Sequence, residues 1–186
     1  GLVVCEKAGA RVGKVMKDSV EPAALCGGRR QVMFEGEGER VISGVLEGEF
    51  WDWRSASPQG AQTTLRVSVR GLVNAIERAS LLISDSVKSP LRMKLEGGLM
   101  QITCSSPLGR AYDELTCQQQ GEGLEIGFNS RYMLDALKAS GCDELQLLFN
   151  GPLSPIKLLP LEGEAFTLLV LPVRLQRGDT GREGGI

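Results

Sequence analysis

Residues 65–82 have the sequence LRVSVRGLVNAIERASLL. Apolar residues recur in this stretch at steps of three and four, which places them on one face of an α-helix. Polar and basic residues, among them Arg66, Arg70, Asn74 and Arg78, occupy the opposite face. We therefore predict an amphipathic helix over 65–82. Its apolar stripe consists of Leu65, Val69, Leu72, Ile76 and Ala79.

Short strands are expected on the C-terminal side of this helix. The Gly97-Gly98 pair between two apolar runs is typical of a tight hairpin turn. Further along, Asn129-Ser130 is a good N-cap for a helix over 130–140. The predicted strands are 90–97, 99–106, 109–117 and 124–128 before that helix, and 144–150, 155–160 and 166–175 after it.

The N-terminal part of the chain repeats this plan. A helix is predicted over 6–18, and strands follow at 23–26, 30–36 and 40–50. Helices thus begin near residues 6, 66 and 130, which indicates an αβββ unit repeated three times. The expected fold class is α+β, with helices on one face of antiparallel sheets.

The stretch WDWRSASPQGAQTT at 51–64 is polar and rich in turn-forming residues, so we place a domain boundary there. The Gly-rich segment 176–186 has almost no apolar residues and is predicted to be a disordered tail. The chain begins with Gly1 and not Met, followed by the apolar run LVV, so we expect it to be a piece of a longer protein.

Composition excludes several classes of function. The 186 residues carry a net charge of −2 and no histidine, which removes Ser-His-Asp triads and His-ligated metal sites. No C-x-x-C pair occurs among the five cysteines, which we expect to be reduced thiols serving as small buried residues. No signal peptide or membrane-spanning run is found, so the expected location is the cytoplasm.

Neither phosphate-binding glycine motif is present. The adjacent acidic pairs Asp113-Glu114 and Asp143-Glu144 point to opposite faces if they lie on strands, so neither pair converges on one substrate. We therefore predict no catalytic residues, no metal site and no cofactor.

The three predicted helices are basic although the chain is acidic. They contain nine Lys or Arg against four Asp or Glu. One interpretation is a solvated helix surface; the other is sequence-independent contact with the phosphates of duplex DNA. The candidate DNA-facing residues are Lys7, Arg11, Lys14, Arg66, Arg70, Arg78, Arg131 and Lys138.

The C-terminal run FTLLVLPVRL and both tryptophans, Trp51 and Trp53, supply apolar surface. These residues either pack on the core as an edge strand and linker, or form an exposed groove that captures a short peptide of a partner.

Four motifs resemble the C-terminal half of the bacterial DNA polymerase III beta subunit family, the replicative sliding clamps. They are ERVISGVLEGEFWDW at 39–53, IGFNSRYMLDALKA at 126–139, LLFNGPLSPIKLLP at 147–160 and LVLPVRL at 169–175. With the helix at 65–82 they cover residues 3–175. The resemblance implies six αβββ-like repeats in three domains per subunit, and two subunits closed head to tail around DNA.

This resemblance assigns residues 1–57 to the C-terminal half of the clamp's middle domain and 58–175 to its C-terminal domain. It implies a pocket for partner peptides formed by Trp51, Ser55, Ala56, Leu169, Leu171, Pro172, Val173, Arg174 and Leu175. It also implies a subunit interface that includes Arg78, Leu81 and Leu82.

The function that the resemblance implies is that of a non-catalytic DNA polymerase processivity factor. Its expected partners are double-stranded DNA, the replicative polymerase, the clamp loader, other proteins with a clamp-binding motif, and a second copy of the chain in a homodimeric ring. The alternative is a clamp-derived scaffold that binds peptides without encircling DNA.

Overall fold

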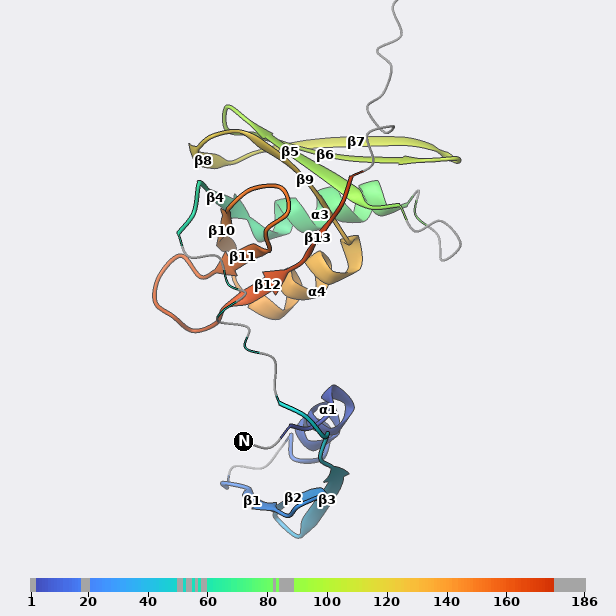
Figure 1. The fold of residues 1–186 in the computed structure, drawn as a ribbon, viewed down its shortest axis with the longest axis vertical. Helices are drawn as coiled ribbons and strands as arrows, with labels where there is room; N and C mark the ends of the chain where they lie inside the picture. The colour runs from blue at the N-terminus through green and yellow to red at the C-terminus, as the bar shows by residue number, and fades with distance from the viewer. Residues whose placement is uncertain are drawn as a thin grey trace, which may run out of the picture. The chain divides into compact units, whose positions relative to one another are not determined.

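The computed structural model describes residues 3–17, 21–49, 52, 55, 57, 60–81, 83 and 89–175. Within these residues it contains three helices and thirteen strands, arranged in three antiparallel sheets (Figure 1). The chain divides into two compact units, Gly1–Asp52 (unit 1) and Trp53–Ile186 (unit 2). The α+β class predicted from the sequence is confirmed. The predicted domain limits 1–57 and 58–175 stay a prediction.

Unit 1 is a single helix against a small sheet. Helix α1 (Glu6–Val15) is followed by β1 (Ala24–Gly27), β2 (Gln31–Gly36) and β3 (Glu39–Gly44), which pair in the order β1-β2-β3. Among its described residues, the buried apolar side chains are Ala8, Val32 and Val41. The helix therefore covers one face of the sheet, as the sequence predicts.

Unit 2 contains two five-stranded sheets and two helices that share one continuous core. The first sheet has the order β12-β11-β10-β4-β8, and the second has the order β13-β9-β5-β6-β7. The helices are α3 (Val69–Ser80) and α4 (Ser130–Ser140). The strands of the first sheet are β4 (Thr63–Ser68), β8 (Gln118–Gly121), β10 (Glu144–Phe149), β11 (Ile156–Leu159) and β12 (Leu168–Val170). Those of the second are β5 (Leu91–Glu96), β6 (Leu99–Ser106), β7 (Gly109–Thr116), β9 (Leu124–Phe128) and β13 (Pro172–Val173).

Each sheet of unit 2 has an inner face that packs on the helices and an outer face that does not. Leu65 and Val67 of β4, and Met93 of β5, point inward and are almost completely buried with Leu72 and Ile76 of α3. Because side chains alternate along a strand, their neighbours in sequence point outward.

The predicted helix over 65–82 begins later in the structure. Residues Thr63–Ser68 form β4, and only Val69–Ser80 are helical. The sequence pattern here fits both structures. A strand is compatible with the alternation of Leu65, Val67 and Val69, and a helix is compatible with the spacing of Leu65, Val69 and Leu72. Ser68 is the N-cap that starts helix α3, because its Oγ accepts a hydrogen bond from the Gly71 amide at 3.3 Å.

Two local predictions are confirmed. Gly97 and Gly98 both have positive φ, +61° and +83°, and connect β5 to β6 as the tight hairpin requires. Asn129 is the N-cap of α4, since its Oδ1 accepts hydrogen bonds from the amides of Arg131 at 2.9 Å and Tyr132 at 3.4 Å.

The C-terminal run 166–175 is not the single strand that the sequence predicts. Leu168–Val170 form β12 and pair with β11, whereas Pro172 and Val173 form β13 and pair with Phe128 and Gly127 of β9. The chain thus leaves the first sheet and joins the second at Leu171. This crossing places the end of the described chain on the outer face of the second sheet.

None of the five cysteines, all in the described part of the chain, forms a disulfide, and Cys104 is buried as predicted. Cys5 and Cys26 are exposed, so the prediction of buried thiols is wrong for these two. No helix in the described segments is long and apolar enough to span a membrane.

Candidate functional site

The exposed faces of α3 and α4 carry both ion-paired and unpaired cations among the described residues. Lys138 of α4 pairs with Glu77 of α3, with 2.9 Å between Nζ and Oε1. Arg70 at the start of α3 and Arg131 at the start of α4 are exposed and make no ion pair with any residue that the structure describes. These two guanidinium groups are therefore available to an external anion.

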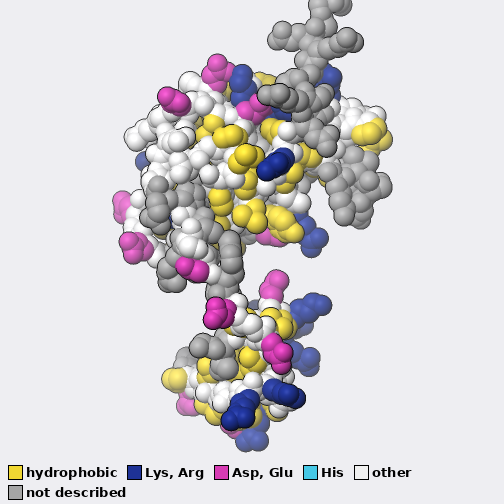
Figure 2. Space-filling view, viewed as in Figure 1, with side chains coloured by type: hydrophobic (Ala, Val, Ile, Leu, Met, Phe, Trp, Pro, Cys, Tyr) yellow, Lys and Arg dark blue, Asp and Glu magenta, His cyan; other side chains and the backbone are white. Residues whose placement is uncertain are grey.

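Helix α1 of unit 1 presents a similar surface. Lys7, Arg11 and Lys14 are exposed, while Ala8 is buried against the sheet. No ion pair to these three cations is found among the described residues. Figure 2 shows several Lys and Arg side chains over this smaller unit. The predicted basic surface of α1 is thus present and solvated.

Arg66 does not belong to the helical surface to which the sequence prediction assigned it. It lies on β4, where Leu65 and Val67 point inward, so Arg66 points outward, away from the helices. Its Nη2 is 2.5 Å from Oε2 of Glu144 on the neighbouring strand β10. The placement of Arg66 on a helix was therefore wrong, and with it the reason for grouping Arg66 with the helical cations.

Arg78 is joined to the sheet by an ion pair, although its side chain is 60% exposed. Its guanidinium donates a hydrogen bond to Asp113 of β7, whose side chain is only 16% exposed. Strand β7 is an unpaired edge of the second sheet, and Leu81, just beyond α3, is 82% exposed. This edge of the second sheet therefore offers the backbone hydrogen-bonding groups of β7 together with the apolar surface of Leu81, and Arg78 lies beside them.

The hydrogen bond from Arg78 lowers the pKa of Asp113 below its ordinary value of 3.8. A carboxyl group with a lowered pKa in the folded state stabilises the fold above its ordinary pKa, and this contribution is lost as the pH falls through the lowered value. We therefore expect Asp113→Asn to reduce the free energy of unfolding at neutral pH and to have progressively less effect below about pH 4. Urea denaturation across this pH range measures the difference.

Asp135→Asn is the matched control, because Asp135 is exposed on α4. It should leave the free energy of unfolding nearly unchanged. An Asp113→Asn effect that persists undiminished in acid would show that packing, and not the charge on Asp113, is responsible.

A hollow lies beside the C-terminal segment. It has a volume of about 400 Å³. Val170 is buried and anchors the segment, while Leu171 is 58% exposed. Figure 2 shows hydrophobic side chains gathered where α4, β12 and β13 lie in Figure 1. We call this hollow the terminal groove; it is lined by Glu125, Gly127, Pro152, Leu153, Val173, Arg174 and Leu175.

Gly127 determines how closely the C-terminal segment approaches β9. A Cβ atom at this position would lie 2.5 Å from the Val173 carbonyl oxygen and 2.7 Å from Cδ2 of Leu175. Such contacts are shorter than any that a packed Cβ atom tolerates. Only glycine lets Val173 and Leu175 lie across the outer face of β9.

Some residues predicted for the partner-peptide pocket lie at this groove, and the pocket itself stays a prediction. The structure places Val173, Arg174 and Leu175 in its lining, and Leu169, Leu171 and Pro172 lie in the same segment. Ser55 is exposed. Trp51, Ala56 and Leu82 lie outside the described residues. Sequence reasoning missed Gly127, Pro152 and Leu153, although the motifs IGFN and NGPLSP contain them.

The acidic pair Asp113-Glu114 lies on a strand with its side chains on opposite faces, as predicted. Asp113 binds Arg78 of α3 on the inner side, whereas Glu114 accepts a hydrogen bond from the Tyr112 hydroxyl at 2.5 Å. No cluster of three or more metal-ligating side chains occurs among the described residues.

Comparison with known proteins gives one consistent family. Residues 54–174 match the family model for the DNA polymerase III beta subunit, C-terminal domain. The beta sliding clamps of Staphylococcus epidermidis and Staphylococcus aureus are each 31% identical over 175 residues, which cover 93% of this chain and 46% of theirs. The chain therefore spans about half the length of the curated relatives it matches.

Solved structures agree with this match. The DNA polymerase sliding clamp of Bacillus subtilis superposes with a TM-score of 0.86 at 29% identity, over 94% of this chain and 47% of that chain. A DNA polymerase III beta subunit from Eubacterium rectale gives 0.83 at 28% identity, over 92% and 47%. The resemblance seen in the sequence is confirmed: the chain belongs to the DNA polymerase III beta subunit family, the beta sliding clamps.

Proposed function

We propose that this chain is the C-terminal part of a non-catalytic DNA polymerase processivity factor that acts in the cytoplasm as a head-to-tail dimeric ring. The observation that supports this most strongly is the family match over residues 54–174. A ring that surrounds duplex DNA retains its partner proteins there by topology, and weak contacts with phosphates permit sliding.

The DNA-facing surface is proposed to be the exposed side of the three helices. It comprises Lys7, Arg11 and Lys14 of α1, Arg70 of α3, and Arg131 and Lys138 of α4. Among the cations of unit 2, Arg70 and Arg131 support this role best, because neither makes an ion pair with a described residue, whereas Lys138 pairs with Glu77. Contacts of this kind are sequence-independent and depend on salt.

We expect Arg70→Glu combined with Arg131→Glu, in the complete protein, to weaken binding to duplex DNA at low salt. Each cation–phosphate contact that is lost should reduce the slope of log K against log salt by about one. Arg66→Glu is the matched control, because Arg66 points to the outer face of β4 and should leave that slope unchanged. Equal effects of the two variants would contradict a DNA-facing role for the helices.

The partner-binding pocket is proposed to consist of the terminal groove together with Leu169, Leu171 and Pro172, and with Trp51, Ser55 and Ala56 on the linker side. Exposed Leu171 and Val173 supply apolar surface, and Arg174 supplies a charge at the rim. A short extended peptide with apolar anchors fits such a site. The partners are the replicative polymerase, the clamp loader and other proteins with a clamp-binding motif.

Subunit contact is proposed to occur at β7, Arg78, Leu81 and Leu82. Strand β7 is eight residues long and exposes one row of backbone groups. An unpaired edge of this length favours strand addition by another chain. The exposed Leu81 side chain adds apolar surface to the same edge.

A further inference from the structure

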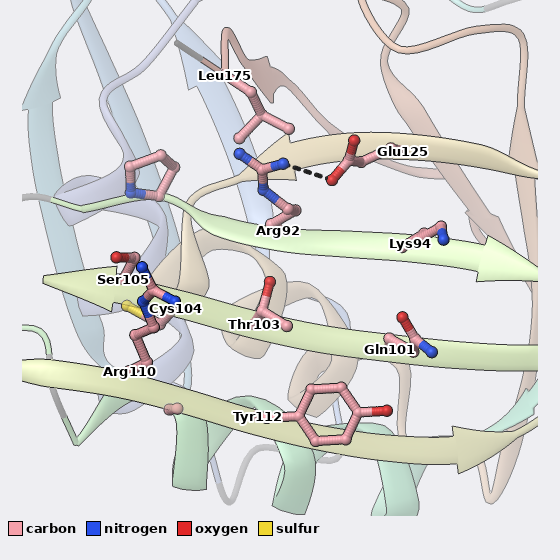
Figure 3. A pocket seen from close by; sticks show the side chains of 12 residues that line it. Arg92, Lys94, Gln101, Thr103, Cys104, Ser105, Arg110, Tyr112, Glu125 and Leu175 are labelled. Atoms are coloured by element: carbon pink, nitrogen blue, oxygen red, sulfur yellow. Dashed lines mark hydrogen bonds and ion pairs between the residues drawn. The ribbon is translucent and has the colours of Figure 1, made fainter. Parts of the chain in front are cut away.

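The outer face of the second sheet of unit 2 contains a hollow of about 310 Å³ with an unusual concentration of charge (Figure 3). We call it the outer hollow. Its floor is formed by outward-pointing side chains of neighbouring strands: Arg92 of β5 lies beside Thr103 of β6, which lies beside Tyr112 of β7. Lys94 lies beside Gln101 in the next row.

Cations outnumber carboxylates in this lining. Arg92, Lys94 and Arg110 contribute three positive charges against the single carboxylate of Glu125. Arg92 is paired with this carboxylate, with 2.6 Å between its Nη1 and Oε1 of Glu125. Arg110 is exposed and makes no ion pair with the described residues, so among the three cations of the lining it is the one left without a carboxylate partner.

Lys94 is also partly available. Its Nζ is 2.8 Å from Glu96, but the lysine side chain is 50% exposed, and exposed pairs of this kind exchange readily with other anions. Gln101 and Thr103 add polar groups that can bond to a peptide backbone or a carboxylate. The outer hollow is therefore suited to a ligand with two or more carboxylates.

The outer hollow adjoins the terminal groove. Leu175 and Glu125 line both. In Figure 3, Leu175 lies next to the Arg92 guanidinium, which the dashed line joins to Glu125. A peptide chain that leaves the terminal groove past Leu175 therefore enters the outer hollow without crossing another element of the described structure.

We propose that the outer hollow binds an acidic segment that flanks the groove-binding motif of a partner protein. This inference rests on the proposed partner-binding function of the terminal groove and adds a preference for acidic flanks. A peptide is favoured over duplex DNA for two reasons. The hollow lies on the sheet face opposite α3, away from the helical cations, and Pro90 and Leu175 give it apolar walls.

The experiment compares synthetic peptides bound to the complete protein. Each contains the clamp-binding segment of the cognate replicative polymerase, extended at its N- or C-terminal end by three glutamates, three glutamines or three lysines. Dissociation constants are measured by fluorescence anisotropy at low and high salt. New ion pairs of the added glutamates with Lys94 and Arg110 should make the glutamate extension bind about five-fold more tightly than the glutamine extension, at one of the two ends. The lysine extension should weaken binding at the same end.

Lys94→Gln combined with Arg110→Gln should abolish this glutamate gain while leaving the affinity of the glutamine-extended peptide unchanged. Both side chains are exposed, and the melting temperature verifies the fold. Arg66→Gln is the control, because it neutralises an exposed, paired cation on β4 of the first sheet, and it should keep the gain.

Three outcomes would overturn the proposal. If the glutamate and glutamine extensions bind equally tightly at both ends while the central peptide still binds, the proposed site for an acidic flank is contradicted and the terminal groove is not. Failure of the central peptide to bind contradicts the terminal groove itself, and the acidic flank with it. If a duplex oligonucleotide competes with the glutamate-extended peptide, and this competition is lost when Lys94 and Arg110 are replaced, the hollow binds nucleic acid and not an acidic peptide segment.

Discussion

Removal of residues 171–186 is expected to abolish binding of a polymerase-derived peptide to the complete protein, with a loss of affinity of at least about 100-fold. The deleted stretch contains β13 (Pro172–Val173), and Val173, Arg174 and Leu175 form one side of the terminal groove. Residues at the centre of an interface each contribute on the order of 2 kcal/mol or more, so loss of the whole segment removes most of the binding energy.

The matched control removes only residues 176–186, which leaves every proposed groove residue in place. Peptide affinity, measured by fluorescence anisotropy, should then be retained. Binding that survives the longer deletion would refute the assignment of the groove. Loss of binding in the shorter deletion would show that residues beyond Leu175 contribute to the site.

Gly127→Ala is the second change with a large expected effect. The added Cβ would contact the Val173 carbonyl oxygen at 2.5 Å and Leu175 Cδ2 at 2.7 Å, so the C-terminal segment must move away from β9. Overpacking of this kind costs about 1–3 kcal/mol, and the displaced segment no longer shapes the groove. We expect peptide affinity to fall about ten-fold or more, with increased amide exchange of Val173.

Gly71→Ala tests whether the effect depends on position. Its Cβ would meet only ordinary van der Waals contacts, the nearest at 3.6 Å, within helix α3. This variant should leave peptide affinity unchanged and slightly favour the helix. Similar losses in the two variants would mean that the affinity change reflects general destabilisation and not the seating of Val173 and Leu175.

Local signals accounted for much of the fold. Asn129 marks the start of α4 because its side chain bonds to amides only two and three residues away, and Gly97-Gly98 marks a hairpin because both residues adopt positive φ. Such features depend on a few neighbouring residues, so they are visible in the sequence alone.

Features that depend on distant strands were not predictable in this way. The sequence predicts a helical turn where β4 lies, because the spacing of Leu65 and Val69 fits both structures, and pairing with β10 decides between them. Strand β8, QQQG, has no apolar pattern and is a strand because it pairs with β4. The division of the C-terminal run at Leu171 likewise depends on two different sheets.

The residues of the candidate site were likewise only partly predictable from local sequence. The end residues Val173, Arg174 and Leu175 were expected in the groove, but Gly127 and Leu153 reach it from segments far away in sequence. The charge pattern placed Arg66 on a helical surface and did not predict that Arg78 bonds to Asp113. Charge counts locate basic surfaces, whereas ion pairs between elements require the tertiary structure.

The most direct test of the proposed ring is retention on DNA of different topology. The complete protein is placed by its clamp loader on a nicked circular duplex, and its residence after gel filtration is compared before and after the circle is cut once. A topological tether should remain on the circle and leave the linear DNA by sliding off its ends. Equal residence on circular and linear DNA would contradict encirclement and favour a peptide-binding scaffold.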